Sequence, residues 1–196
     1  MGLEFLESEH AYLLDGKRVP SVTQVIREIL APDEYAGVSR EVLDHAANRG
    51  RAVDRMIELD LAGELAPESL HPELLPYWRA WQAFPDRQAW ANLEPVCQGQ
   101  VFSAPYGYAG TFDILLRSDD VLIDVKATAL VPRTVGVQTA AYAIAMTRSN
   151  SCGDLKRFCL HVTPTGCKLI RLPHTGDSAD FLAALRVYHW RHRHDA

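Results

Sequence analysis

The sequence lacks the marks of an exported or membrane-spanning protein. No apolar run approaches the roughly 18 residues that a bilayer-spanning helix needs. The first residues, MGLEFLESEH, are acidic and mixed, unlike a secretory signal. The four cysteines form no CxxC pair, so we favour free thiols packed in strands over a metal cluster or a disulfide framework. We therefore expect a cytoplasmic protein that does not associate with membranes.

The chain also lacks an excess of positive charge. Its 20 Lys and Arg against 25 Asp and Glu give a net charge of −5, which argues against a nonspecific basic coat for nucleic acid. A nucleic-acid enzyme is not excluded, because a metal-binding acidic site adds negative charge of its own. Positive charge gathers locally, in NRGRAVDRMIE and in the tail RVYHWRHRHDA, although such clusters are more often solvated faces.

Composition and patterning predict one mixed α/β domain over residues 1–196, with 47% hydrophobic and 23% charged residues and no internal repeat. Residues 1–38 are expected to form an N-terminal extension, a hairpin with its turn at Asp15-Gly16 followed by a helix capped by Ser21. Apolar periodicity then predicts the following elements. They are helices at 39–61 and 72–84, strands at 92–103, 107–118 and 121–128, a helix at 134–147, a hairpin at 156–173, and a helix at 178–192.

Two aspartates interrupt apolar strands. Side chains alternate along a strand, so Asp124 and Lys126 should share one face while Ile123 and Val125 enter the opposite layer. If the two strands form a hairpin, Asp113 converges on Asp124. Two neighbouring carboxylates repel each other unless a cation lies between them. Oxygen ligands with few candidate nitrogens or sulfurs favour Mg²⁺ or Mn²⁺ over zinc.

Lys126 suits hydrolysis beside such an ion. Its ammonium could orient a metal-bound water, or help to deprotonate it, and offset charge in a phosphodiester transition state. The alternative is a plain Asp–Lys ion pair on a solvent-facing strand, which the tripeptide DVK alone would favour.

Two helices offer further polar pairs at helical spacing. Asp54 and Glu58 share one face of the helix at 39–61, where Glu58 could supply a third carboxylate and Asp54 could assist a second ion. Gln138 and Tyr142 share a face of the helix that follows the DVK strand, so they can reach Lys126. The competing interpretations are a surface glutamate and a helix edge that reaches solvent.

The segments RGRAVDRMIE, YAGTFD, IDVKAT and VQTAAYAIA occur in this order on helix, strand, strand and helix. Together they resemble the RecB-type branch of the PD-(D/E)XK nuclease superfamily, and small phage-type recombination exonucleases in particular. The resemblance implies a restriction-endonuclease-like mixed sheet flanked by helices, with an αβββαβ core. It also implies DNA as substrate and a bacterial or phage-infected cell as the setting.

The resemblance implies one or two Mg²⁺ or Mn²⁺ ions. Their ligands would be Glu58, Asp113, Asp124, the carbonyl of Val125, and Asp54. Many relatives carry a histidine where this chain has Asp54, so metal preference is open. Iron–sulfur members of the branch place four cysteines differently, so we expect no iron–sulfur cluster here.

The resemblance assigns the catalytic roles to three further side chains. Lys126 would assist the attacking water, while Gln138 and Tyr142 would position this lysine and contact DNA. We also expect phosphate contacts from residues near the motifs. These residues are Arg49, Arg51, Arg55, Thr128, Arg133 and Thr134.

The sequence therefore predicts a metal-dependent deoxyribonuclease, most simply an exonuclease of recombination or repair. A structure-specific or flap endonuclease is an alternative, and a non-catalytic nucleic-acid-binding module with the same fold is another. The resemblance implies a single-strand annealing or strand-exchange recombinase as partner. Polarity, strandedness, DNA versus RNA, and oligomeric state are left open.

Overall fold

The computed structural model describes residues 2–7, 9, 11–149, 152–173 and 175–193. They form a three-stranded sheet with the order β1-β2-β3 and a five-stranded sheet with the order β4-β5-β6-β7-β8. The strands are β1 (Leu3–Leu6), β2 (Ala11–Leu14), β3 (Lys17–Val19), β4 (Val96–Ser103), β5 (Tyr108–Leu116), β6 (Val121–Lys126), β7 (Lys156–Thr163) and β8 (Gly166–Arg171).

Helices and helical turns occupy most of the remaining chain. The α-helices are α1 (Val22–Val25), α2 (Arg40–Leu61), α3 (Leu75–Gln82), α4 (Arg87–Asn92), α5 (Val135–Thr147) and α6 (Asp177–Arg191). The shorter turns are η1 (Ile26–Leu30), η2 (Pro67–Ser69), η3 (Pro72–Leu74) and η4 (Arg117–Asp119). Among the residues that the structure describes, no helix has both the length and the apolar character to cross a membrane.

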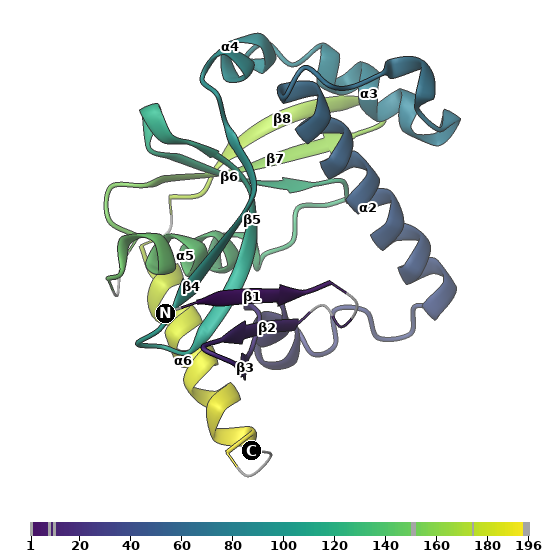
Figure 1. Ribbon diagram of the computed structural model, residues 1–196. Helices are drawn as coiled ribbons and strands as arrows, with labels where there is room; N and C mark the ends of the chain where they lie inside the picture. Colours follow the sequence, from purple (N-terminus) through teal and green to yellow (C-terminus); the bar gives the residue numbers. More distant parts are fainter. Residues whose placement is uncertain (1, 8, 10, 150–151, 174, 194–196) are drawn as a thin grey trace.

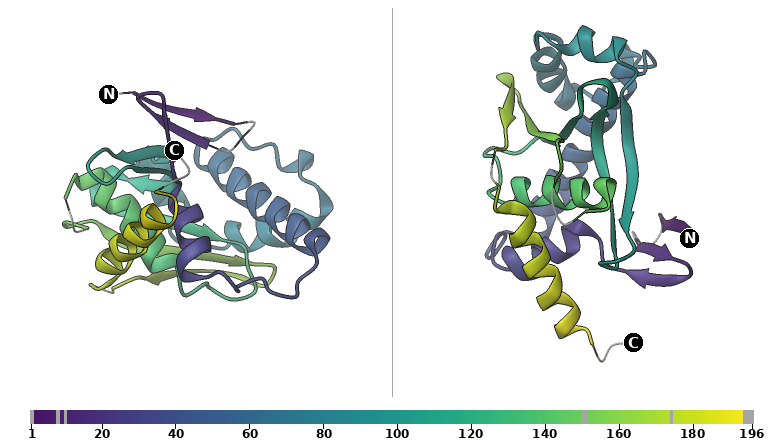
Figure 2. Two further views of the ribbon diagram at one scale, coloured as in Figure 1. Left: turned by 90° about the horizontal axis from the view of Figure 1, so that it is seen from below. Right: turned by 90° about the vertical axis from the view of Figure 1, so that its left-hand side faces the viewer.

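The larger sheet lies between two layers of helices (Figure 1, Figure 2). On one face, α1, η1, α5 and α6 pack with Tyr108, Phe112 and Leu122. On the other face, α2, α3 and α4 pack with strand residues such as Ile123 and Leu160. Burying both faces of a sheet in this way provides two apolar cores. The predicted mixed α/β architecture is therefore confirmed.

Local signals placed most elements correctly. The helix predicted at 39–61 is α2, where Ser39 Oγ accepts a 3.4 Å hydrogen bond from Val42 N. The turn predicted at Asp15-Gly16 is confirmed by φ values of 48° and 78°. The helix expected at 72–84 is instead η3 followed by α3, because Pro76 falls in the first turn of α3 and marks a new helix start.

The two central strands separate at the end that carries the motif residues. The antiparallel ladder of β5 and β6 runs from Leu116↔Val121 to Ile114↔Ile123 and ends there. Strand β6 continues to Lys126 in a parallel ladder with β7, reached through α5. The sheet therefore opens between β5 and β6, next to Asp113.

The N-terminal sheet docks on β5 at this open end. Tyr12 Oη lies 2.8 Å from Thr111 Oγ1, and Ala109 N donates a 3.1 Å hydrogen bond to Pro20 O. Figure 1 shows β1, β2 and β3 beside the lower end of β5, apart from β7 and β8. The segment predicted as an extension thus forms one wall beside the motif residues.

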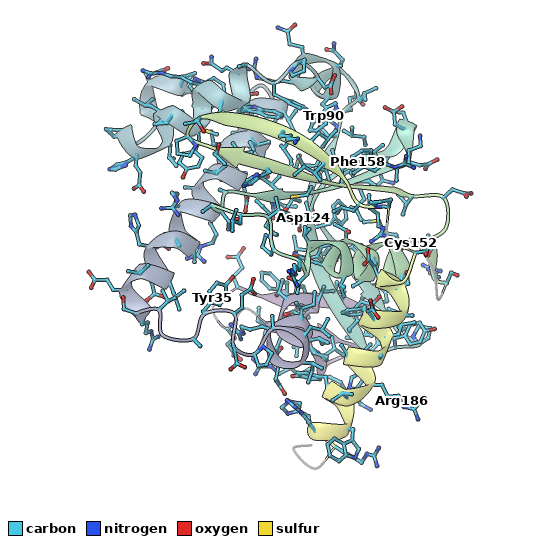
Figure 3. All side chains as sticks on the ribbon, turned by 180° about the vertical axis from the view of Figure 1, so that it is seen from behind. Tyr35, Trp90, Asp124, Cys152, Phe158 and Arg186 are labelled. Carbon is cyan, nitrogen blue, oxygen red and sulfur yellow. The ribbon has the colours of Figure 1, made fainter. Side chains whose placement is uncertain are left out.

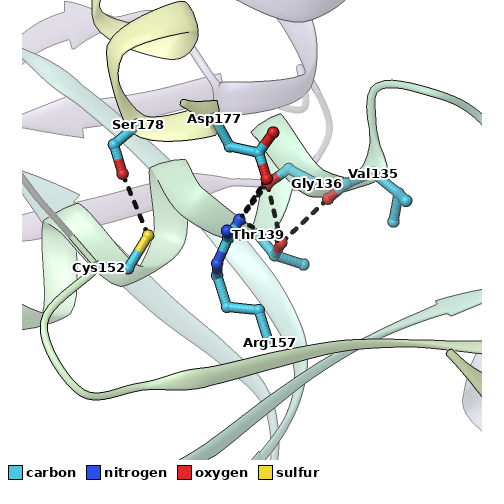
Figure 4. Close-up of polar contacts among 7 residues, drawn as sticks. All are labelled: Val135, Gly136, Thr139, Cys152, Arg157, Asp177 and Ser178. Atoms are coloured by element: carbon cyan, nitrogen blue, oxygen red, sulfur yellow. Dashed lines mark hydrogen bonds and ion pairs between the residues drawn. The ribbon is translucent and has the colours of Figure 1, made fainter. Parts of the chain in front are cut away.

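A buried arginine fixes the start of α5 (Figure 4). Arg157 on β7 donates from Nη1 to Gly136 O at 2.6 Å and pairs with Asp177 Oδ2 at 3.0 Å. A Cβ on Gly136 would lie 2.6 Å from Asp177 Oδ2, so only glycine allows this approach. This network ties β7, α5 and α6 together, and α5 carries Gln138 and Tyr142.

Candidate active site

Asp113 lies at the point where β5 leaves β6. Continued register would place it opposite Asp124, but no backbone pair forms there. Instead, Asp113 Oδ2 accepts a 2.7 Å hydrogen bond from Val125 N. The Gln98 side chain on β4 is a second hydrogen-bond partner of Asp113. The carboxylate therefore takes the place of a backbone carbonyl as the acceptor for Val125 N, and this bond fixes its position between the two strands.

Asp124 and Lys126 lie on the same face of β6, as the strand alternation predicts. Asp124 is 1% exposed, and its Oδ2 lies 2.5 Å from Lys126 Nζ. Ile123 and Val125 enter the opposite apolar core. Among the described residues, Asp124 Oδ1 has no hydrogen-bond donor. A buried carboxylate oxygen without a donor is costly, so this atom is poised to accept a cation or a water.

Negative charge is crowded at this end of the sheet. Burial, and then the charge of Asp124, raise the pKa of Asp113 to about 7. Burial also raises the pKa of Asp124, opposed by Lys126. Burial alone would lower the pKa of Lys126, but Asp124 and Asp113 outweigh it and hold that pKa above its ordinary value. Lys126 is thus an ammonium at neutral pH, compensating part of the acidic charge.

Helix α2 carries the two other predicted carboxylate ligands, Asp54 and Glu58. Burial and the charge of Asp113 raise the pKa of Asp54 well above its ordinary value, and Lys126 opposes this. Glu58 Oε2 pairs with Arg55 Nη1 at 2.8 Å. Burial raises the pKa of the Cys97 thiol to about 11, with added contributions from Glu58 and Asp113. Asp54 therefore lies within electrostatic reach of Asp113, whereas Glu58 and Asp113 each lie near Cys97.

The donor set suits a hard divalent cation, although the side chains are not gathered around one point. Among the residues that are described, no group of three or more His, Cys, Asp and Glu has the arrangement needed to hold a metal ion. Asp124 is paired with Lys126 and Glu58 with Arg55. The Asp124 oxygen without a donor and the raised carboxyl pKa values still indicate acidic charge that is not fully compensated. Mg²⁺ or Mn²⁺ would compensate this charge. Metal binding would require these ion pairs to rearrange.

Gln138 and Tyr142 meet on α5, one turn apart. Gln138 Nε2 donates a 3.0 Å hydrogen bond to Tyr142 Oη. Burial raises the pKa of Tyr142, and the charges of Asp124 and Asp113 raise it further, so the phenol lies close to both. A Cβ on Gly110 would lie 2.7 Å from Tyr142 Cε1. The glycine three residues before Asp113 thus lets the tyrosine ring pack against β5.

A cavity of about 570 Å³ opens next to Lys126 and Gln138. One wall comes from α5 and the segment after β6, and the other from the N-terminal hairpin, α1, η1 and the segment before α2. Figure 3 shows Tyr35 on that segment and Asp124 within the sheet. The charged lining residues are Glu9, Arg18, Arg27, Glu34 and Lys126. Because Lys126 lines this cavity, its side chain is accessible from that side.

The predicted phosphate-binding residues have varied surroundings. Arg49 Nη1 is 3.9 Å from Glu73 Oε1, Arg51 Nη2 donates to Asn48 Oδ1 at 2.6 Å, and Arg55 pairs with Glu58. Thr128 and Thr134 line the Lys126 cavity, although Thr128 Oγ1 donates to Leu130 O at 2.7 Å. Arg133 is exposed beside a separate hollow formed with residues 30–34. Only the two threonines therefore border the cavity.

Sequence reasoning missed several neighbours of the motif residues. Gln98 bonds Asp113 from β4 and adopts φ 50°, an uncommon backbone conformation for glutamine. His161 lies opposite Lys126 in the parallel ladder, and its Nε2 donates a 2.7 Å hydrogen bond to Thr128 O. Arg27 and Tyr35 reach the cavity from the N-terminal part of the chain. No local pattern could have found them, because each depends on tertiary register.

The sequence matches no protein-family model, and no curated protein matches it. Among solved structures, the crystal structure of SSO0001 is similar to this chain at 14% identity and a TM-score of 0.38. The match covers 72% of this chain and 69% of that one.

Proposed function

We propose that this protein is a metal-dependent nuclease of the PD-(D/E)XK type that hydrolyses phosphodiester bonds in DNA as an exonuclease. One observation carries the proposal. Asp113 and Asp124 are drawn together with Lys126 where β5 and β6 separate, and Asp124 keeps a buried oxygen without a donor among the described residues. This is an acid–acid–amine set of the kind that metal-assisted phosphodiester hydrolysis uses.

The order of elements supports a restriction-endonuclease-like core. Helix α2 precedes the antiparallel strands β4, β5 and β6, and α5 then leads to β7, which is parallel to β6. This order agrees with the αβββαβ arrangement that the motifs imply. Helix α2 packs on one face of the sheet and α5 on the other, so the motif residues on these two helices flank β5 and β6 from both sides.

Asp113, Asp124 and the Val125 carbonyl would hold the cation, with Glu58 and Asp54 completing the ligand set for one or two ions. The bound cation would neutralise the carboxylates and act as a Lewis acid toward the phosphoryl oxygen. Asp113 is anchored by Val125 N, so its second oxygen keeps a fixed direction. Electrostatic crowding among these acids makes binding of a cation favourable.

Lys126 is suited to donate rather than to accept a proton. The raised pKa keeps it an ammonium, which can orient a water by its lone pair and neutralise charge on the scissile phosphate. Gln138 lines the same cavity and is held by Tyr142. Tyr142 in turn packs against Gly110. These two residues would hold Lys126 and the phosphate in a fixed relation.

One gel assay tests the proposal. Linear DNA labelled at each end and circular plasmid are incubated with Mg²⁺, Mn²⁺ or chelator, using the native chain, Lys126→Ala and the exposed control Lys168→Ala. We expect metal-dependent cleavage that Lys126→Ala lowers at least about 100-fold, while Lys168→Ala cleaves normally. Circular dichroism and chemical denaturation check that each variant folds, because Lys126→Ala removes the partner of buried Asp124.

The same gel distinguishes the remaining alternatives. An exonuclease degrades the linear DNA and leaves the circle intact, whereas cutting of the circle indicates an endonuclease. Folded native protein that cleaves neither substrate with either metal would contradict the nuclease proposal and favour a binding module.

A further inference from the structure

The outer face of α6 carries an exposed tryptophan. Trp190 is 64% exposed, whereas Trp78, Trp81 and Trp90 are 7%, 0% and 5% exposed. Exposing so large an apolar ring to water costs free energy. The other three tryptophans avoid this cost because they are buried. Packing against the described residues therefore does not account for Trp190.

Two hollows flank this tryptophan. One, of about 650 Å³, lies against Tyr106 and His189, and the other, of about 260 Å³, lies against Val187. Arg186, Trp190 and Arg193 line both. No aspartate or glutamate lines either hollow within the described part of the chain. The indole thus stands between two spaces, each bordered by both guanidinium groups.

The opposite side of α6 holds this face in place. Tyr188 Oη accepts a 2.9 Å hydrogen bond from Gln24 Nε2, and His192 Nε2 lies 2.8 Å from Glu28 Oε1. His189 Nε2 donates to Tyr106 O at 3.1 Å, which fixes the wall of the larger hollow. The helix is therefore anchored on α1, on η1 and on the loop before β5, and Trp190 is presented by a rigid element.

Arg186 and Arg193 form no ion pair with any carboxylate in the described part of the chain. Both guanidinium groups can therefore bind an anion. Arg186 and Trp190 lie one helical turn apart on α6. Arg193 follows two residues after the end of that helix, and it lines both hollows together with them. Against a net charge of −5 for the whole chain, this is a local positive patch around a ring.

We propose that Arg186, Trp190 and Arg193 form a second contact site for single-stranded nucleic acid. A base would stack on the indole, and the guanidinium groups would bind the flanking phosphates. Figure 3 shows Arg186 on α6, well away from Asp124, so this contact would hold the strand outside the candidate active site. The identity of the ligand rests on the proposed function, but the test requires no cleavage.

Intrinsic fluorescence tests the site directly. Because the other three tryptophans are buried, quenching by oligothymidylate in the presence of chelator reports Trp190. We expect quenching that weakens as salt rises, and a loss of affinity of about 10-fold or more in Arg186→Ala/Arg193→Ala. The exposed control Arg171→Ala should bind like the native chain. Anisotropy of a labelled oligonucleotide should show weaker binding for Trp190→Ala than for Trp190→Phe, which keeps an aromatic ring.

Other outcomes overturn the inference. Absent quenching, or equal affinity of the native and double-variant proteins, would remove the site. Quenching by poly-glutamate but not by oligothymidylate would assign the patch to an acidic protein segment instead. The binding assay contains chelator, so its result does not depend on metal-dependent cleavage. A failure of the nuclease proposal can therefore be distinguished from a failure of this site.

Discussion

Divalent cations should stabilise this protein more at alkaline than at acidic pH. The reason is the group of acidic side chains at the open end of β5 and β6, where burial and Asp124 raise the pKa of Asp113 to about 7. In the unfolded chain this carboxyl titrates near 3.8. Between these two pKa values, the folded protein without metal therefore holds a proton on Asp113 that the unfolded chain has already released.

The sign of the effect follows from this difference. A carboxyl with a raised folded pKa does not destabilise the fold below its unfolded pKa, and it costs increasing stability as the pH rises toward the folded pKa. At about 1.4 kcal/mol per pKa unit, Asp113 costs roughly 2 kcal/mol at about pH 5 and roughly 4 kcal/mol at about pH 8. Without metal, the protein should thus lose about 2 to 3 kcal/mol of unfolding free energy between these pH values.

Urea denaturation at the two pH values measures this loss. With chelator we expect the unfolding free energy to fall by the amount above, and with Mn²⁺ most of the loss at alkaline pH should be recovered. Asp113→Asn keeps an oxygen that can accept from Val125 N but removes the charge. It should be less dependent on pH and gain less from Mn²⁺. Asp154→Asn, on an exposed residue, is the matched control.

Two results would refute the reasoning. A native protein whose stability is the same at both pH values in chelator would show that Asp113 is not electrostatically crowded. Equal stabilisation of the native protein and Asp113→Asn by Mn²⁺ would place any bound cation elsewhere. Either result would remove the main physical support for a metal site at these strands.

Two structural predictions concern the scaffold of α5. Gly110→Ala places a Cβ 2.7 Å from Tyr142 Cε1, so it should cost about 1 to 3 kcal/mol in urea denaturation and lower cleavage; Gly166→Ala, with no atom within 4 Å, should do neither. Arg157→Ala leaves Asp177 buried without its guanidinium and should cost about 3 to 5 kcal/mol, whereas a change below about 1 kcal/mol would show that the pair contributes little.

Much of the fold follows from local sequence signals. Alternating apolar residues placed β5, β6 and β7, and helical periodicity placed α2. The same alternation placed Asp124 and Lys126 on one face of β6. These features succeed because side-chain direction in a strand or helix depends on neighbours in sequence alone.

The rest depends on contacts between distant segments. The opposition of Lys126 and His161 is set by a parallel register after a long crossover, which no local pattern specifies. The left-handed backbone at Gln98 and the docking of the N-terminal sheet on β5 are likewise tertiary features. Sequence reasoning expected three acids around one ion, whereas Glu58 is paired with Arg55 and Asp124 with Lys126.

Asp113 joins the fold to the proposed chemistry, and this affects which variants are informative. Its carboxylate accepts from Val125 N where the β5–β6 ladder has ended, so it satisfies a backbone donor as well as carrying charge. Asp113→Ala would leave that donor unpaired, which costs about 1 to 3 kcal/mol in itself. Lost cleavage in Asp113→Ala therefore cannot separate chemistry from folding. Asp113→Asn can, because it retains an oxygen that can accept from Val125 N while it removes the charge that a cation would bind.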